Sequence, residues 1–124
     1  MLGNTLCTCA ILIALASSSS ALGAFETDVV KTSGGDLTIT FIGHGTLMFS
    51  FGGKTIHVDP WSRLADYAKL PKADIVLLTH DHPDHFDPAA LKLVSSEKTA
   101  FILAPDCRGR GFEGTVMKNG DTTT

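Results

Sequence analysis

The pattern of apolar and polar positions predicts an antiparallel meander in the first half of the chain. Residues 37–42 alternate apolar and polar side chains before turning apolar, as in a strand with one buried face. Two further strands are predicted at 46–51 and 54–59. The glycine pair 52–53 between them is a two-residue hairpin signal. Pro60 ends the third strand.

The pattern changes in the second half of the chain to that of a crossover unit. The segment 73–79, with the apolar run 75–78, predicts a buried strand. Asp87 and Pro88 then have the character of a helix N-cap and first helical residue, and the helix continues to about Val94. Residues 99–104 predict another strand. A strand, a helix and a strand in succession favour parallel neighbours in one sheet.

Two shorter segments complete the expected elements. Residues 62–69 predict one or two helical turns, and residues 115–117 begin a strand. Asn119 and Gly120 form a strong hairpin-turn signal, but the sequence stops four residues later. A turn without a returning strand would leave an unpaired edge, so we expect a truncated sequence. A natural end with a frayed tail is the alternative.

The first 23 residues have the composition of a secretory signal peptide. Residues 10–16 are apolar, four serines follow, and Ala21 and Gly23 are small. No charged side chain precedes Glu26, and the apolar segment is too short to span a bilayer. We therefore expect a signal peptide at 1–23 and a linker at 24–36, with export to the periplasm or out of the cell. An uncleaved membrane tether is the alternative.

Composition and charge narrow the possible functions. The 124 residues are 44% hydrophobic, which fits a single globular domain. A formal net charge of -3 does not favour nucleic acid as a partner. Without the first 23 residues one cysteine remains, Cys107, so no intramolecular disulfide can form. We interpret it as an inert buried thiol, with a reactive thiol in a cationic loop as the alternative.

The candidate chemistry lies in the loop that follows the predicted buried strand. His80, His82 and His85 are three of the five histidines and fall within six residues, interleaved with Asp81 and Asp84. Neutral imidazole and carboxylate are the natural ligands of zinc and similar divalent metals. A loop at the end of a buried strand is also where α/β folds place their chemistry. A solvated polar loop is the alternative.

The spacing of these residues suggests how they would share metals. His80 and His82 are two residues apart, so in an extended segment both imidazoles reach one point. A proline and the following helix make the chain curl, which directs Asp84 and His85 to a second point. Two metals about 3.5–4 Å apart suit this arrangement. Asp81 points away, and we interpret it as a structural or ligand-orienting residue.

The motif from His80 to His85 matches the H-x-H-x-D-H signature of the metallo-β-lactamase-fold superfamily. Segments 41–46 and 58–61 resemble one branch, that of the lactonase-like and N-acylphosphatidylethanolamine-phospholipase-D-like metal-dependent hydrolases. The resemblance covers residues 37–124. It implies an α/β fold, the N-terminal half of an αββα metallo-β-lactamase-type sandwich, with the site at one edge between two sheets.

The resemblance also implies the roles of the site residues. His80 and His82 bind one metal, and Asp84 and His85 bind the other. Asp84 positions or deprotonates the attacking water. The implied cofactor is a divalent metal, with two zinc ions expected and manganese or iron as alternatives. The family completes its site with a later histidine, a bridging aspartate and a final histidine, but no histidine follows His85 here.

The function that this resemblance implies is a metal-dependent hydrolase. It would use a metal-activated water on an ester, lactone or phosphodiester in a small-molecule substrate. The partial domain at 37–124 lacks the later ligands, which leaves a non-catalytic metal-binding module as the alternative. We expect no stable membrane span once the signal peptide is removed.

Two residues outside the motif are further candidates. His44 lies between Gly43 and Gly45, where the backbone can turn sharply and approach another group closely. We interpret His44 as a residue that contacts ligand side chains or substrate, with a structural histidine as the alternative. Asp59, at the end of the third strand, is expected to orient a ligand histidine, with a turn cap as the alternative.

Two other side chains are expected to lie outside the site. His57 alternates with its apolar neighbours, which predicts an exposed histidine on the strand. Trp61 is expected to be a core aromatic, with pocket lining as the alternative.

Overall fold

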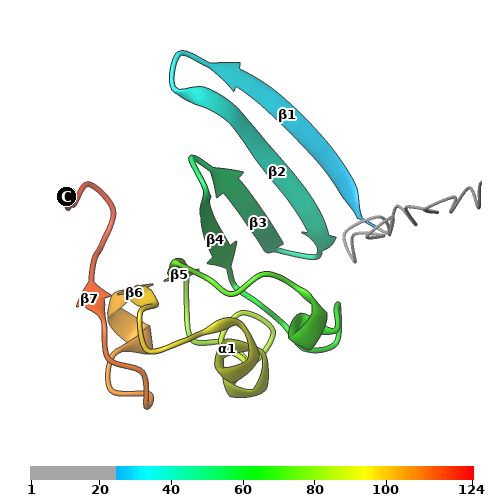
Figure 1. Ribbon diagram of the computed structural model, residues 1–124. Coiled ribbons are helices and arrows are strands. Elements are labelled where there is room, and N and C mark those ends of the chain that lie inside the picture. Colours follow the sequence, from blue (N-terminus) through cyan, green and yellow to red (C-terminus); the bar gives the residue numbers. More distant parts are fainter. Residues whose placement is uncertain (1–24) are drawn as a thin grey trace, which may run out of the picture.

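The computed structural model describes residues 25–124, which form one seven-stranded mixed sheet whose strand order follows the chain (Figure 1). The strands are β1 Glu26–Thr32, β2 Gly35–Gly43, β3 Thr46–Phe51, β4 Lys54–Val58, β5 Ile75–Leu78, β6 Ala100–Leu103 and β7 Thr115–Val116. Strands β1 to β4 pair antiparallel, and β4 to β7 pair parallel. The expected α/β class is confirmed.

The expected signal peptide at 1–23 lies outside the described residues. Within residues 25–124 the helical elements are α1 Pro88–Val94 and two 3₁₀ turns, Tyr67–Lys69 and Pro105–Cys107. None of these has the length and apolar character that crossing a membrane would require.

The turn signals of the meander are confirmed. Gly52 and Gly53 have φ angles of 56° and 76°, the positive values that a tight two-residue hairpin needs and glycine adopts without strain. The hairpin pairs Phe51 with Lys54 and Phe49 with Ile56. This register places Phe49 and Ile56 on a common face.

The region that the sequence analysis assigned to a linker contains strand β1. Residues Glu26 to Thr32 pair with β2 along their whole length, from Glu26 opposite Phe41 to Thr32 opposite Gly35. Every residue of β1 is exposed, so the strand has no buried face and no apolar alternation to reveal it. Main-chain pairing at the sheet edge forms this strand, and the linker assignment is corrected.

The crossover between β5 and β6 follows the expected pattern. Asp87 caps helix α1, because its carboxylate accepts hydrogen bonds from the N–H groups of Ala89 at 2.9 Å and Ala90 at 3.4 Å. Pro88 occupies the first turn, where its missing N–H costs nothing. The segment 62–69 forms only the 3₁₀ turn Tyr67–Lys69, shorter than expected.

The core lies between one face of the sheet and the segments that cross it. Helix α1 contributes Ala90, Leu91 and Val94, each with no exposed surface. The other buried apolar side chains are Ile42, Met48, Tyr67, Leu70, Ala73, Val76, Leu78, Phe86, Leu103 and Cys107. This packing fixes the carboxyl ends of β4 and β5, from which the candidate site extends.

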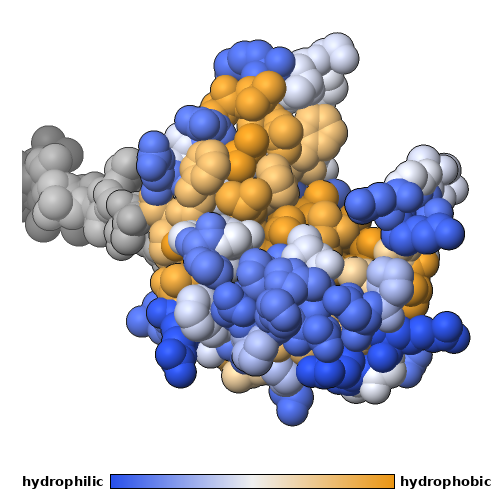
Figure 2. Space-filling view, turned by 180° about the vertical axis from the view of Figure 1, so that it is seen from behind, coloured by the Kyte–Doolittle hydropathy of each residue, from blue (hydrophilic) through white to orange (hydrophobic). Residues whose placement is uncertain are grey.

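The opposite face of the sheet is apolar and only partly covered. Paired residues of neighbouring strands share a face, and the set on this face is Leu37, Ile39, Phe41, Leu47, Phe49, Ile56, Val58, Ile75, Leu77 and Ile102. Figure 2 shows apolar side chains gathered over the meander, above a polar surface. A second sheet would cover such a face in a sandwich.

The expectation that His57 is exposed was wrong. His57 has no exposed surface, and its neighbours in the register, Met48 and Val76, are equally buried. Its Nε2 lies 3.0 Å from the carbonyl oxygen of Pro71, whereas Nδ1 has no partner among the described residues. The apolar residues of β4, Ile56 and Val58, lie on the half-buried face, whereas the core covers the face of His57, and alternation alone could not show which face is covered.

We expect His57 to make the fold sensitive to acid. Burial lowers the pKa of His57 below its usual 6.5, although the hydrogen bond to Pro71 opposes this shift. The unfolded chain therefore binds a proton at a pH where the folded chain does not, and the free energy of unfolding falls as the pH drops below about 6.5, by at most about 1.4 kcal/mol per pH unit. Urea unfolding of the metal-free chain at pH 7 and pH 5 should show a smaller loss for His57→Phe. An equal loss in both proteins would contradict this assignment.

Candidate metal centre

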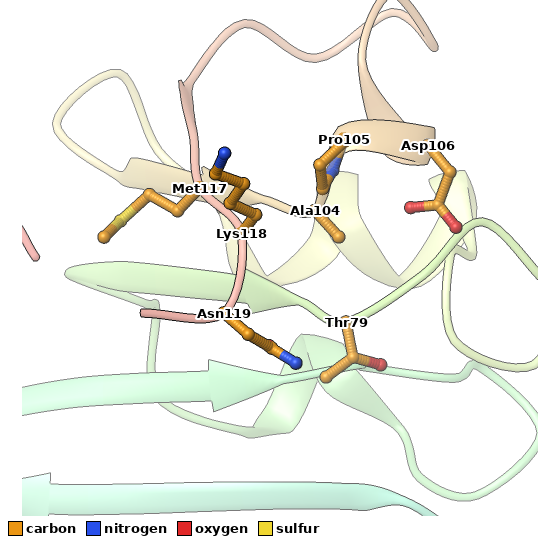
Figure 3. Close-up of a pocket in the computed structure, with 7 residues that line it drawn as sticks. All are labelled: Thr79, Ala104, Pro105, Asp106, Met117, Lys118 and Asn119. Atoms are coloured by element: carbon orange, nitrogen blue, oxygen red, sulfur yellow. The ribbon is translucent and has the colours of Figure 1, made fainter. Parts of the chain in front are cut away.

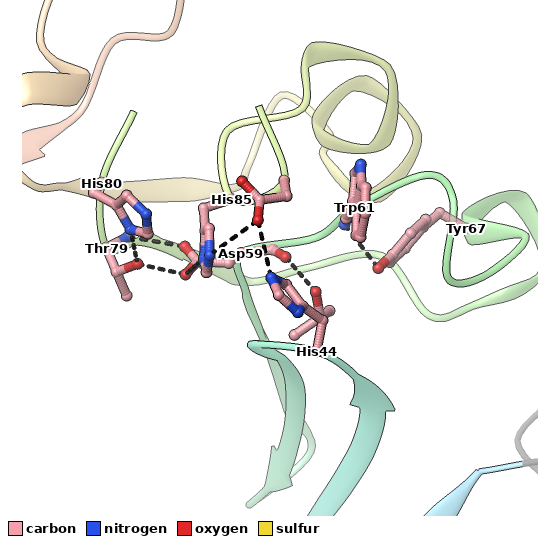
Figure 4. Close-up of polar contacts among 9 residues, drawn as sticks. His44, Asp59, Trp61, Tyr67, Thr79, His80 and His85 are labelled. Atoms are coloured by element: carbon pink, nitrogen blue, oxygen red, sulfur yellow. Dashed lines mark hydrogen bonds and ion pairs between the residues drawn. The ribbon is translucent and has the colours of Figure 1, made fainter. Parts of the chain in front are cut away.

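Three loops, those that follow β2, β4 and β5, bring polar side chains to one edge of the sheet (Figure 4). His44 follows β2, and Asp59 follows β4. Thr79 and His80 follow β5, and His85 ends the loop before α1. The parallel pairing of β4 with β5 puts their carboxyl ends side by side, so the residues after them meet.

Asp59 is the buried centre of this group. Its side chain is only 2% exposed, and its backbone has a φ of 45°, a left-handed conformation that aspartate tolerates better than most residues. The carboxylate accepts hydrogen bonds from the N–H and the hydroxyl of Thr79. Its Oδ2 also lies 2.8 Å from Nδ1 of His85. This is the contact by which a carboxylate orients a ligand histidine and leaves Nε2 free.

His44 reaches the site because of its backbone. Its φ of 50° follows the φ of 135° at Gly43, so the chain turns back sharply after β2. Its Nε2 lies 2.9 Å from Oδ2 of Asp84, and its ring centroid is 5.6 Å from that of Trp61 and 5.5 Å from that of His85. Thus His44 contacts the motif directly, and Trp61 flanks the site.

Glycine at position 45 makes room for His85. A Cβ atom on Gly45 would lie 2.8 Å from Cε1 of the His85 ring. The ring cannot easily move away, because its Nδ1 is held by buried Asp59. The glycines around His44 therefore have two uses, a sharp turn at position 43 and close approach at position 45.

Asp84 is held in its ionised form. The hydrogen bond from His44, the N–H of Asp84 itself and the nearby charge of His85 keep the pKa of the Asp84 carboxyl below its usual range. Oδ2 of Asp84 also lies 3.6 Å from Nε2 of His85. A carboxylate with this pKa accepts hydrogen bonds and ligates cations at neutral pH.

Two overlapping sets of three residues have the geometry to hold a metal ion. In each set the candidate ligand atoms lie within 4.8 Å of one another. One set is His44, Asp84 and His85, and the other is Asp59, His80 and His85. His85 belongs to both. Imidazole nitrogen and carboxylate oxygen are donors that zinc accepts, so the residues present fit a divalent metal.

The grouping differs from the one that spacing suggested. Asp84 and His85 do lie together, but His80 is grouped with Asp59 and His85 and not with His82. The ring of His82 lies near that of His80, with centroids 4.7 Å apart, and belongs to neither set of three. His44 and Asp59 thus stand beside the motif as potential ligands. The Gly-His-Gly pattern pointed to His44, but no local pattern marked Thr79 as a partner of Asp59.

Two residues near the site have other contacts. Asp81 points to Arg110, whose Nη1 lies 3.0 Å from Oδ2 of Asp81. Cys107 is fully buried, and burial together with the charge of Asp106 raises the pKa of its thiol to about 11. A thiol with this pKa stays protonated and unreactive at neutral pH.

An open cavity of about 540 Å³ adjoins the site at Thr79 (Figure 3). It is lined by Thr79, Ala104, Pro105, Asp106, Met117, Lys118 and Asn119. Thr79 connects the cavity to the metal-ligand sets, because its side chain also contacts Asp59 and His80. The cavity offers one ammonium, one carboxylate and one amide group to a small polar molecule.

Comparison with known proteins places these features in a family. Residues 38–124 match the model of the beta-lactamase superfamily domain. A "UPF0173 metal-dependent hydrolase" of Ignicoccus hospitalis is 31% identical over 87 residues, which cover 61% of this chain and 37% of that protein. A protein of the same description from Shouchella clausii is 40% identical over 82 residues, covering 63% and 36%. The chain thus spans a little over a third of the length of these relatives.

A solved structure extends the likeness to three dimensions. The crystal structure of a "Putative metal-dependent hydrolase" from Parabacteroides distasonis has 47% sequence identity and a TM-score of 0.77, covering 80% of this chain and 46% of that one. The resemblance read from the histidine motif is confirmed, as is its restriction to one part of the fold. By its sequence and its sheet, this chain belongs to the beta-lactamase superfamily.

Proposed function

We propose that this chain carries a metal centre of a hydrolase that acts on an ester, lactone or phosphodiester in a small molecule. The observation that supports it best is the position of His85 between two carboxylates, Asp59 at 2.8 Å and Asp84 at 3.6 Å. The relatives described above are named metal-dependent hydrolases, which supports the same reaction class.

Zinc is the metal we propose, with manganese or iron as alternatives. His44, Asp84 and Nε2 of His85 would hold one ion, and Asp59 and His80 would provide donors for another. A bound divalent metal would supply a water of lowered pKa and stabilise developing negative charge. His82, whose ring centroid lies 4.7 Å from that of His80, would add a further donor to the second ion.

The side chains have separate tasks in this proposal. Asp59 holds Nδ1 of His85 and leaves Nε2 facing Asp84. His44 shares a hydrogen bond with Oδ2 of Asp84 and keeps that carboxylate ionised. Asp84 would then accept a hydrogen bond from the attacking water and take up its proton. The cavity beside Thr79 would receive the substrate.

The reaction class is tested by hydrolysis with and without metal. The full chain would be assayed with an activated ester, a lactone and a phosphodiester after loading with zinc, manganese or iron. We expect at least one substrate to be cleaved and the activity to disappear on chelation and return when metal is added back. Metal binding without cleavage of any substrate would favour the metal-binding module over the enzyme.

The composition of residues 1–23 supports the further proposal that the chain is exported.

A further inference from the structure

A segment far along the chain contacts the metal-ligand loop. Arg110 lies 29 residues beyond Asp81, and its Nη1 donates a hydrogen bond to Oδ2 of Asp81 at 3.0 Å. Its guanidinium carbon also lies 5.7 Å from the centroid of the Phe86 ring. Asp81 stands between His80 and His82, and Phe86 directly follows His85. Arg110 therefore contacts the loop near both of its ends.

The segment that carries Arg110 is itself anchored on the sheet. The ring of Phe112 lies 5.8 Å from that of Phe86, edge to face, and 5.2 Å from that of Phe101 in β6. Gly114 passes so close to Phe101 that a Cβ atom there would lie 2.5 Å from the Phe101 carbonyl oxygen. The position of Arg110 is thus tied to strand β6.

The loop between β5 and α1 has few bonds of its own. In its middle, the carbonyl oxygen of His82 accepts hydrogen bonds from the N–H groups of His85 and Phe86. Asp81 is one-third exposed, and a free carboxylate at this position could turn toward a cation as a competing ligand. Its pairing with Arg110 keeps it directed away from the histidines.

From these contacts we propose that Arg110 is a positioning residue of the metal centre. It holds Asp81 and Phe86 and thereby keeps His80 and His85 in the arrangement that ligates metal. An exposed ion pair adds little to the stability of a fold, so its effect falls on the ordering of the loop and not on the sheet. The inference rests on the proposed function only in that this loop binds metal.

The test is a titration of the full chain with zinc against a competing chromophoric chelator. We expect R110A and D81N each to lower the zinc affinity by about 3- to 10-fold, less than the 10- to 100-fold typical of groups bonded directly to a ligand. The double variant should lose about as much zinc affinity as either single variant, because both changes break the same contact. R110K should recover part of the loss, since it keeps the charge.

Two further readouts separate positioning from general destabilisation. The melting temperature of the metal-free protein should be the same in R110A and the wild type. The visible absorption of bound cobalt should shift in R110A, because the ligand geometry changes. The matched control is K31A, which removes a shorter and more exposed ion pair with Asp36 in the β1–β2 hairpin and should leave zinc affinity unchanged.

The possible contrary results are distinct. Wild-type zinc affinity in R110A would overturn the role of Arg110 while leaving the metal centre in place. A loss of affinity matched by an equal loss in K31A, or by a lower melting temperature of metal-free R110A, would show a general effect on the fold and overturn it as well. If the wild-type chain binds no zinc, the metal centre itself is wrong and the inference fails with it.

Discussion

Replacing His85 by asparagine is expected to lower the zinc affinity of the chain by more than about 100-fold. Losing a group that is only hydrogen-bonded to a metal ligand costs less, about 10- to 100-fold. His85 belongs to both sets of potential ligands, so its loss removes a donor from whichever set holds the ion. The asparagine amide can take the place of Nδ1 and still donate to Asp59, but it has no counterpart of Nε2. Zinc titration against a chelator would measure the change.

The alanine variant at the same position provides the matched comparison. His85→Ala removes Nε2 and also the hydrogen bond to buried Asp59 at 2.8 Å. A buried carboxylate that loses a partner destabilises the fold, by about 1–3 kcal/mol. We therefore expect His85→Ala to melt at a lower temperature than His85→Asn, with both defective in zinc binding. Near-normal zinc affinity in His85→Asn would remove His85 from the ligand set.

Replacing Asp84 by asparagine is expected to lower the rate of hydrolysis by about 10²- to 10⁴-fold at saturating metal, the range for loss of a general base. The amide cannot take up a proton from water, although it can still pair with His44. The pKa of Asp84 lies below the usual range of an aspartate, so the wild-type carboxylate stays ionised at every pH above that range. The wild-type rate should therefore not fall near pH 5 through protonation of Asp84.

Metal content must be measured in the same samples, because Asp84 is also a potential ligand. Elemental mass spectrometry on the assayed protein separates a loss of metal from a loss of base. The control is Asp36→Asn, a surface carboxylate in the β1–β2 hairpin that pairs with Lys31. Equal rates in the wild type and a fully loaded Asp84→Asn would exclude Asp84 as the proton acceptor.

Local signals predicted much of the fold correctly. The glycines at 52 and 53 and the pair Asp87-Pro88 act within a few residues of their own position, and both formed the expected turn and cap. Strand β1 was not predicted, because pairing at a sheet edge needs only main-chain groups and does not require a pattern of apolar side chains. His57 was misplaced because alternation separates two faces of a strand without saying which one the core covers.

The structure brings several of the predicted site residues together, but in a grouping that differs from the one the spacing suggested. The sequence indicated His80, Asp84 and His85 through their density in one loop, and all three appear among the potential metal ligands. Spacing paired His80 with His82 on the assumption of an extended segment. The loop instead turns at His82, whose carbonyl oxygen bonds to the N–H groups of His85 and Phe86, and this brings His85 beside His80.

The sequence by itself determined the chemical character of this protein: imidazoles and carboxylates crowded after an apolar strand, in a motif that identifies the superfamily. Only the tertiary structure decided which of them meet. Asp59 reaches His85 because β4 and β5 run parallel, and Arg110 reaches Asp81 because its segment is tied to β6. The physical reason is that donor chemistry belongs to each residue alone, whereas distances between residues far apart in the chain depend on strand pairing and packing.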